Sequence, residues 1–356
     1  MNKRLFPLHR FISTGTLVLS LSVTSFAAHS SDEVLRSGAD YDGQPLEVVT
    51  DTNISSTLVS NLADSFVEVR AIVPAGIKPQ DYQLTDEDLE QIKQADFLVY
   101  QGLETMPEFE QLAEQRPESD RVALGPAPPA FRLRERKDGS TNPYTYLSPA
   151  LWQDSVDALA RGLKDQLYHS AGRIEGNRLR VNIELQSLER ETSGLVGELS
   201  RSQRLLVTDN DAFAYFAQHF NFQLFNINDP EQSEQAIELI NQQDTPHVFQ
   251  VEQLGDGAIE QWLNANRDAL PEGIGIAEPL KVVSLGEDIT TTANYTGWFR
   301  QNVTRILEGL DPLPEILDAG GDETLPDPLE TEESVTPEPL ETGEEPIPTE
   351  APMPTP

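Results

Sequence analysis

Three short polar segments hold the side chains of this sequence that are best suited to bind a ligand. They are Pro79-Gln80-Asp81-Tyr82, Asn142-Pro143-Tyr144 and Thr208-Asp209-Asn210-Asp211. Their amide, phenol and carboxylate groups suit hydrogen bonds to a small polar molecule, or ligation of a hard cation such as Mn²⁺, Mg²⁺ or Ca²⁺. Zinc favours imidazole and thiolate donors, and these segments contain neither histidine nor cysteine.

Patterns of catalytic residues are missing from the sequence. No serine lies in a G-x-S-x-G frame, and neither a P-loop nor an H-E-x-x-H sequence occurs. Three of the five histidines, His169, His219 and His247, stand near the ends of expected helices or strands, where a capping or surface role is the usual one. Because no nucleophile is paired with a base, we predict a binding protein and not an enzyme.

The elements that would carry the polar segments alternate along the chain. Short apolar runs and helical stretches follow one another between residues 44 and 310, which predicts an α/β fold of two lobes with mostly parallel sheets flanked by helices. Thr85 and Asp88 have the spacing of a capping box at a helix start. In the first lobe we expect strands at 46–50, 67–73 and 97–100, and helices at 54–62, 85–94 and 148–168.

One long helix is predicted over residues 174–199, because apolar side chains recur at three- and four-residue steps from Val181 to Leu199. At about 1.5 Å per residue it would span roughly 35–40 Å, enough to join two lobes rigidly. The second lobe is expected to hold strands at 204–208, 222–225, 247–251 and 281–285, and helices at 212–219, 231–241, 258–269 and 292–310. The predicted organisation is a signal peptide (1–27), an N-terminal extension (28–45), an N-terminal lobe (46–170), a bridging helix (171–200), a C-terminal lobe (201–311) and an acidic tail (312–356).

The polar segments and the order of the elements around them resemble the periplasmic zinc and manganese binding proteins of ABC transporters. In that family the segments read P-H-x-Y, N-P-H-x-W and T-x-H-D-A-F, and each supplies one histidine to the metal. The resemblance covers residues 46–310 and includes Val73-Pro74-Ala75-Gly76 and Val251-Glu252, which is similar to an F-V-E-P segment. It implies two α/β lobes joined by a rigid helix, with a metal in the cleft between them and a small motion on binding.

This sequence departs from the family pattern at the metal ligands. The three histidine positions are Gln80, Tyr144 and Asn210, and the acid of an L-D-P-L-G segment aligns with Val283. Amide oxygens are poor zinc ligands, and a phenol binds metal only after it loses a proton with a pKa of about 10. The resemblance therefore implies that the usual metal site has been dismantled.

Nearby acids could rebuild a site of oxygen ligands for a harder cation. The candidate replacement ligands are Asp81, Asp209 and Glu252, and Asp211 also lies in these segments. Short acids often cap loops and helix starts, which is the expected role of Asp81 and Asp211, so Asp209 is the best candidate. Zinc or manganese is the transported ligand that the resemblance implies, and the sequence leaves open whether either metal binds.

The two ends of the chain differ in composition from the middle. A basic start, the apolar stretch 11–26 and Ser25-Phe26-Ala27 predict a signal peptide that is cleaved after Ala27. The sequence has no cysteine, so we expect neither a disulfide nor a lipid anchor, and place the protein free in the periplasm. From Asp311 onward there is no Lys, Arg or His, and this acidic, proline-rich composition predicts a disordered tail.

Charge narrows the choice of partners. The formal net charge of −35 argues against nucleic acid, which needs a basic surface. The densest basic cluster, Arg132 to Lys137, is expected to be a solvated loop. The alternatives are that it faces the cleft and favours an anionic ligand or an acidic partner, or that it folds onto the acidic tail.

The leading hypothesis is a monomeric solute-binding protein that delivers its ligand to the membrane permease of a zinc- or manganese-type ABC transporter. One alternative is a protein of the same fold that binds a small polar non-metal solute through Gln80, Tyr144 and Asn210. A second alternative is a non-transporting interaction or regulatory module.

Overall fold

The computed structural model describes residues 44–243, 245–252, 254, 257–283, 285 and 294–310. The predicted signal peptide, all but the last two residues of the N-terminal extension, and the predicted tail lie outside the described residues. Within the described ranges, no helix has both the length and the apolar character that crossing a membrane requires.

The first lobe is built on a four-stranded sheet in which every neighbouring pair is parallel, with strand order β2-β1-β3-β4. Alternate side chains of a strand point to opposite faces. Val48 and Val99 therefore join the main core with helices α1 and α4, whereas Val49 and Leu98 pack with α2 and α3. The elements are β1 (Leu46–Thr50), α1 (Asn53–Ala63), β2 (Val67–Ala71), α2 (Asp86–Gln94), β3 (Phe97–Tyr100), α3 (Pro107–Glu114), β4 (Arg121–Ala123) and α4 (Pro149–Gln166).

The second lobe repeats the parallel arrangement with shorter strands. Strand β5 pairs with β6, and β7 pairs with β8. Single parallel bridges, Thr208 to Phe249 and Val251 to Leu280, extend these pairings. The elements are β5 (Leu205–Thr208), α6 (Ala214–Phe220), β6 (Gln223–Asn226), α7 (Pro230–Gln243), β7 (His247–Val248), α8 (Ala258–Ala265), β8 (Gly275–Ile276) and α9 (Tyr295–Leu310). The predicted α/β class with mostly parallel sheets is confirmed.

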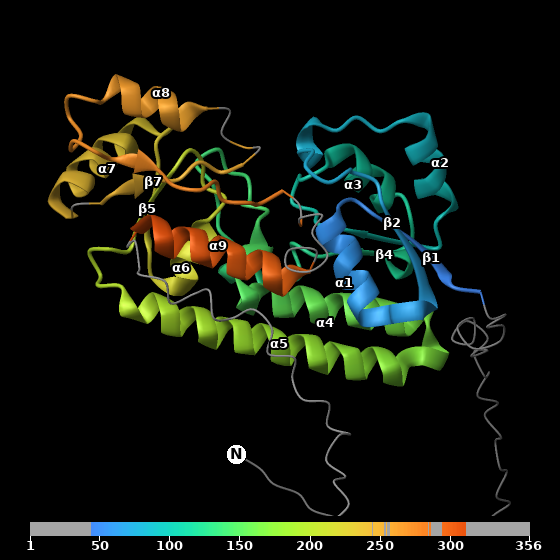
Figure 1. Ribbon diagram of the computed structural model, residues 1–356. Coiled ribbons are helices and arrows are strands. Elements are labelled where there is room, and N and C mark those ends of the chain that lie inside the picture. The colour runs from blue at the N-terminus through green and yellow to red at the C-terminus, as the bar shows by residue number, and fades with distance from the viewer. Residues whose placement is uncertain are drawn as a thin grey trace, which may run out of the picture. The chain divides into compact units, whose positions relative to one another are not determined.

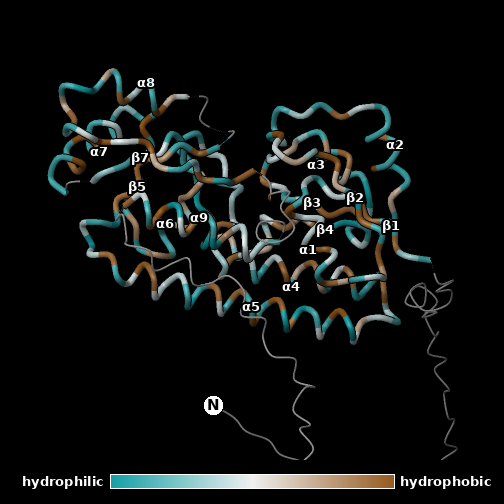
Figure 2. Tube along the Cα trace, viewed as in Figure 1, coloured by the Kyte–Doolittle hydropathy of each residue, from teal (hydrophilic) through white to brown (hydrophobic). Residues whose placement is uncertain are grey.

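A single helix, α5 (Ala171–Glu198), packs against α1 and α4 of the first lobe and against α9 of the second (Figure 1). Its buried residues include Val181, Leu185, Leu188 and Val196, close to the predicted face. Hydrophobic and hydrophilic residues alternate along α5 in Figure 2. One continuous core cluster contains these residues together with residues from both lobes, so α5 joins the lobes by packing.

The strand predicted at 281–285 does not form at its described residues, because a side chain binds the backbone there. The N–H of Lys281 donates to Asn302 Oδ1 at 2.7 Å, and Asn302 Nδ2 donates to the Lys281 carbonyl at 2.8 Å. The amide of Asn302, on α9, thus takes the place of a neighbouring strand. Helix α3 and strands β4 and β8 were not predicted.

Candidate functional site

The central strands of the two lobes end in the same way. The sequence V-T-D occurs at 49–51, where β1 ends, and at 207–209, where β5 ends. The Asp51 carboxylate accepts the N–H of Gln101 at 2.6 Å, and the Asp209 carboxylate accepts the N–H of Val251 at 3.2 Å. Both aspartates are 1% exposed, and each one ties its strand end to the segment that follows a neighbouring strand. Burial raises the pKa of Asp51, although hydrogen bonds from Gln101, Ser55 and Thr52 oppose the rise.

Three of the four positions that match family ligands meet at one small cavity. Gln80, Tyr144 and Val283 line it together with Thr52 and Gln101. The space measures about 10 Å³, which is room for about one water molecule. The fold thus brings together three positions that are far apart in the sequence.

Local structure sets each of these three side chains in place. Gln80 lies in a 3₁₀ turn, η3 (Pro79–Asp81), that starts at a proline. The N–H of Tyr144 donates to Asn142 Oδ1 at 3.0 Å, which fixes the backbone at the tyrosine. Val283 follows the backbone that Asn302 holds, and so is positioned by α9.

Asn210, the fourth position, is engaged within its own loop. Its Nδ2 donates to Asp209 Oδ1 at 2.7 Å, and its Oδ1 accepts the N–H of Ala212 at 2.9 Å. It does not line the cavity that Gln80, Tyr144 and Val283 share. Its neighbour Asp211 provides the link to the rest of the site.

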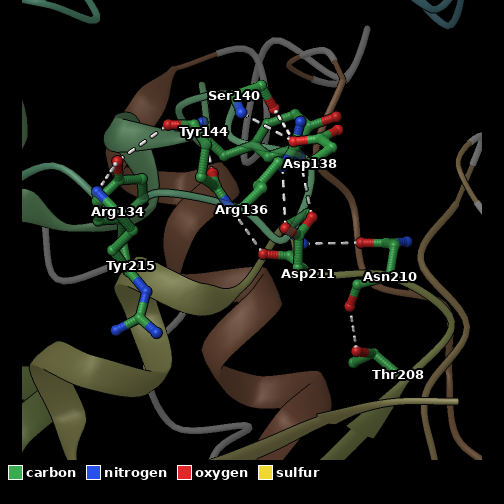
Figure 3. Close-up of polar contacts among 11 residues, drawn as sticks. Arg134, Arg136, Asp138, Ser140, Tyr144, Thr208, Asn210, Asp211 and Tyr215 are labelled. Atoms are coloured by element: carbon green, nitrogen blue, oxygen red, sulfur yellow. Dashed lines mark hydrogen bonds and ion pairs between the residues drawn. The ribbon is translucent and has the colours of Figure 1, made fainter. Parts of the chain in front are cut away.

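Arg136 connects Asp211 with Tyr144. Its Nε and Nη2 donate to the two carboxylate oxygens of Asp211, both at 2.9 Å (Figure 3). Its guanidinium carbon lies 5.6 Å from the centre of the Tyr144 ring. Burial alone would lower the pKa of Arg136, but the hydrogen bonds and charge of Asp211 outweigh it, and the pKa is raised. A permanently charged guanidinium therefore lies beside a position that matches a family metal ligand.

The phenol of Tyr144 is a poor metal ligand in this setting. Burial raises its pKa above the ordinary value of 10.0, while Arg136 and a hydrogen bond with Gln80 offset only part of the rise. The hydroxyl is thus protonated at neutral pH, and a protonated phenol does not compete for a divalent cation.

A tight hairpin presents Arg136. The N–H of Arg136 donates to the Ser140 carbonyl at 2.8 Å, and the N–H of Gly139 donates back to the Arg136 carbonyl at 3.0 Å. Gly139 has φ +84°, a conformation that glycine adopts at little cost, and the Asp138 carboxylate accepts the Ser140 N–H at 2.9 Å. The Asp138-Gly139 pair is a turn signal in the sequence, and it could have predicted this hairpin and drawn attention to Arg136.

The other members of the basic cluster also pair with residues of this chain. Arg132 forms an ion pair with Asp154 in the first lobe, and Lys137 pairs with Asp229 in the second. Arg134 donates through Nη1 to Gln218 Oε1 at 3.1 Å. The segment that we expected to be a solvated loop therefore contacts both lobes.

The candidate replacement ligands do not gather at one point. The Asp81 side chain is 69% exposed and lies 3.8 Å from Lys78. Asp209 accepts the hydrogen bonds described above, and Glu252 does not line the cavity. Across the described ranges, no three His, Asp or Glu residues form a group that could hold a metal ion.

Comparison with known proteins shows which family this chain belongs to. The family model described as "Zinc-uptake complex component A periplasmic" matches residues 48–309. The chain belongs to this family. The resemblance drawn from the polar segments is thereby confirmed.

Several curated relatives of this zinc-uptake family member carry a metal in their names. The manganese-binding lipoprotein MntA of Bacillus subtilis is 23% identical over 75% of this chain and 90% of its own length. The manganese ABC transporter substrate-binding lipoprotein PsaA of Streptococcus mitis is 24% identical over 83% of this chain and 98% of its own. The zinc-binding protein TroA of Treponema pallidum is 24% identical over 76% and 90%. Two of these relatives are named lipoproteins, so the expectation of an unanchored protein stays a prediction.

Solved structures of the same kind share the fold of this chain. The periplasmic zinc binding protein TroA from Treponema pallidum superposes with a TM-score of 0.68 at 21% identity, over 75% of this chain and 99% of that one. A cadmium-bound periplasmic metal binding protein from Candidatus Liberibacter asiaticus gives 0.65 at 18% identity, over 75% and 100%. The prediction of two α/β lobes joined by a long helix is confirmed at the level of the fold.

Proposed function

We propose that this protein is an exported, monomeric partner of a membrane ABC permease of the metal-transporting type, and that its site between the lobes takes neither zinc nor manganese through the family's ligand positions. Family membership and the ABC-transporter relatives support export and the partnership with a permease, whereas the monomeric state rests on the sequence prediction alone. The pairing of Arg136 with Asp211 beside a protonated Tyr144 carries the second.

The free donors at the site are too few to hold a transition metal. Gln80 offers an amide, Val283 offers no donor atom, and Asn210 already uses both ends of its amide. Asp211 follows Asn210 directly in the sequence, and the charge of Arg136 already balances it. We assign Asp209 a structural role, because it holds a strand end as Asp51 does in the other lobe.

The structure supports binding of a small polar solute less well than it supports a site that binds no ligand. The groups that would bind it, Gln80 and Tyr144, do line one cavity. At about 10 Å³ the space is filled by about one water, so a solute would enter only after the lobes had moved apart. Ligand sites for drug-sized molecules measure roughly 300–1,000 Å³.

Elemental analysis of natively purified protein, followed by calorimetric titration with Zn²⁺ and Mn²⁺, tests the metal part of the proposal. We expect less than one equivalent of metal after dialysis and no saturable heat with either ion. One tightly held equivalent that survives dialysis would overturn the proposal. The residues to replace next would then be Asp81, Asp209 and Glu252.

The permease part needs a separate measurement. The metal-type ABC transporter of the source cell would be reconstituted in nanodiscs, and its ATPase rate measured with and without this protein. We expect a saturable change in rate that needs no added metal. An ATPase rate that stays constant at saturating protein would favour a non-transporting module instead.

A further inference from the structure

We infer that Arg136 determines the specificity of this site, because its guanidinium is a built-in cation that takes the place of a metal ion. The inference rests on the proposed function, in which the site takes no transition metal. It goes further by stating that the charge of Arg136 opposes metal binding even where the family ligands are restored. The loss of the four ligands then explains only part of the change in specificity.

The guanidinium contacts groups from both lobes, as a cation between them would. Asp211 belongs to the second lobe and accepts two hydrogen bonds from Arg136 in a bidentate pair. Tyr144 belongs to the first lobe and presents its ring to the guanidinium at 5.6 Å, within reach of a cation–π contact. A planar guanidinium pairs with a carboxylate more specifically than an ammonium does, and it keeps its charge at every physiological pH.

The backbone around Arg136 is fixed to the second lobe, so the guanidinium is held in one place. Asn142 Nδ2 donates to the Asp211 carbonyl at 2.8 Å. The Tyr215 hydroxyl donates to the Asn142 carbonyl at 2.9 Å and accepts the N–H of Arg134 at 3.0 Å. These bonds involve Arg134 and Asn142, which stand before and after Arg136 in the hairpin. The ion pair is therefore part of a network and not an isolated surface contact.

Two consequences follow for any metal that approaches. Asp211 is already neutralised, so it does not attract a second cation. The positive charge of Arg136 also repels a divalent ion at the neighbouring positions. Restoring the family ligands should accordingly restore only weak zinc binding for as long as Arg136 stays.

The test compares ligand-restored proteins with and without Arg136. The substitutions Gln80→His, Tyr144→His, Asn210→His and Val283→Asp would be introduced together in the full chain, alone and combined with Arg136→Ala. Zinc affinity would be measured by calorimetry. We expect removal of Arg136 to tighten zinc binding about 10- to 100-fold, the range that corresponds to the loss of charge-assisted hydrogen bonds to a carboxylate.

Arg134→Ala in the same ligand-restored chain is the matched control. Arg134 lies two residues away on the same hairpin, and its guanidinium binds an amide instead of the Asp211 carboxylate. We expect zinc affinity to be unchanged by this substitution. Equal zinc affinity in the chains with Arg136 and with Arg136→Ala would overturn the inference. Zinc binding by the native chain would instead overturn the proposed function, so the two failures are distinguishable.

A milder variant keeps the inference testable if four substitutions disturb folding, which circular dichroism would report. Tyr144→His with Asn210→His supplies two imidazoles, and Arg136→Ala releases the Asp211 carboxylate as a third donor. We expect zinc to raise the melting temperature of this triple variant and not that of the double variant. An equal shift in both would contradict a role for Arg136.

Discussion

Replacing Asn302 with leucine should destabilise the chain, because it removes both partners of the Lys281 backbone. Asn302 is 2% exposed, and its amide accepts from the Lys281 N–H at 2.7 Å and donates to the Lys281 carbonyl at 2.8 Å. Leucine has a similar size and leaves these two groups without a protein partner. The segment held in this way leads directly to Val283 at the candidate site.

The expected loss can be worked out from these contacts. A buried polar group left without a partner costs about 1–3 kcal/mol. Lys281 is only partly buried, so water reaches its backbone in part, and we take the lower half of that range for each group. The buried leucine offsets about 1 kcal/mol through its apolar surface. The free energy of unfolding should therefore fall by about 1–3 kcal/mol.

Urea unfolding, followed by the fluorescence of the three tryptophans, measures this loss. With a slope of about 3 kcal/mol per molar urea, the midpoint should fall by roughly 0.3–1 M. A midpoint equal to that of the native chain would refute the reasoning, because it would mean that water satisfies Lys281 as well as the amide does.

Asn302→Asp is the matched control, because it keeps the acceptor for the Lys281 N–H and loses the donor to its carbonyl. Protonation of the introduced carboxyl restores that donor, so its pKa in the folded chain should be raised above the unfolded value. The destabilisation should then be fullest above the raised pKa and shrink as the pH falls through it. A loss that is independent of pH would show that the missing donor is not its cause.

Three further outcomes test the packing and the electrostatics. Gly309→Ala should lower the free energy of unfolding by about 1–3 kcal/mol, because the added Cβ would lie 2.6 Å from the Phe249 ring. Gly176→Ala, inside α5 with nothing within 4 Å, should raise it by about 0.5–1 kcal/mol. Urea midpoints that shift in the same direction for both variants would contradict this. Burial raises the pKa of Tyr295 well above 10.0, so in an ultraviolet titration it should ionise only as the chain unfolds in alkali. A hydrogen bond from Arg178 is the main reason why the pKa of Glu175 is lowered to about 2, so carbon NMR should show that low value in the native chain and a return towards about 4.3 in Arg178→Ala. Because the folded pKa is depressed, any stability from this pair is present above the unfolded value and is lost as the pH falls through about 2.

Elements governed by local pattern were predictable from the sequence. Strand Leu46–Thr50 and strand Phe97–Tyr100 have the predicted bounds, because continuous apolar runs favour buried parallel strands. The capping box at Thr85 and Asp88 forms with both of its hydrogen bonds. In these places neighbouring residues alone decide the structure.

Features that depend on distant residues were not predictable in this way. Arg136 meets Asp211 across 75 positions of sequence. The sequence alone predicted a solvated loop at Arg136 and a capping role for Asp211. Ser148 stands at the start of α4, as predicted, but its side chain makes no capping bond, and its Oγ lies 3.5 Å from His219 Nδ1. Tertiary partners decide the role of each of these side chains, and a single sequence does not name them.

The Arg136 guanidinium is covalently attached to the chain that it neutralises. A dissociable ion occupies its site according to its free concentration, so the state of a protein that binds one reports the supply of that ion. A tethered group has an effective concentration set by its own linker, which dilution or a chelator does not change. Because the hairpin at 134–142 carries this charge, the charge at the site does not depend on the metal concentration of the surrounding medium. If Arg136 takes the place of a metal ion, as we infer, the protein should have the same conformation in metal-starved and metal-rich cells.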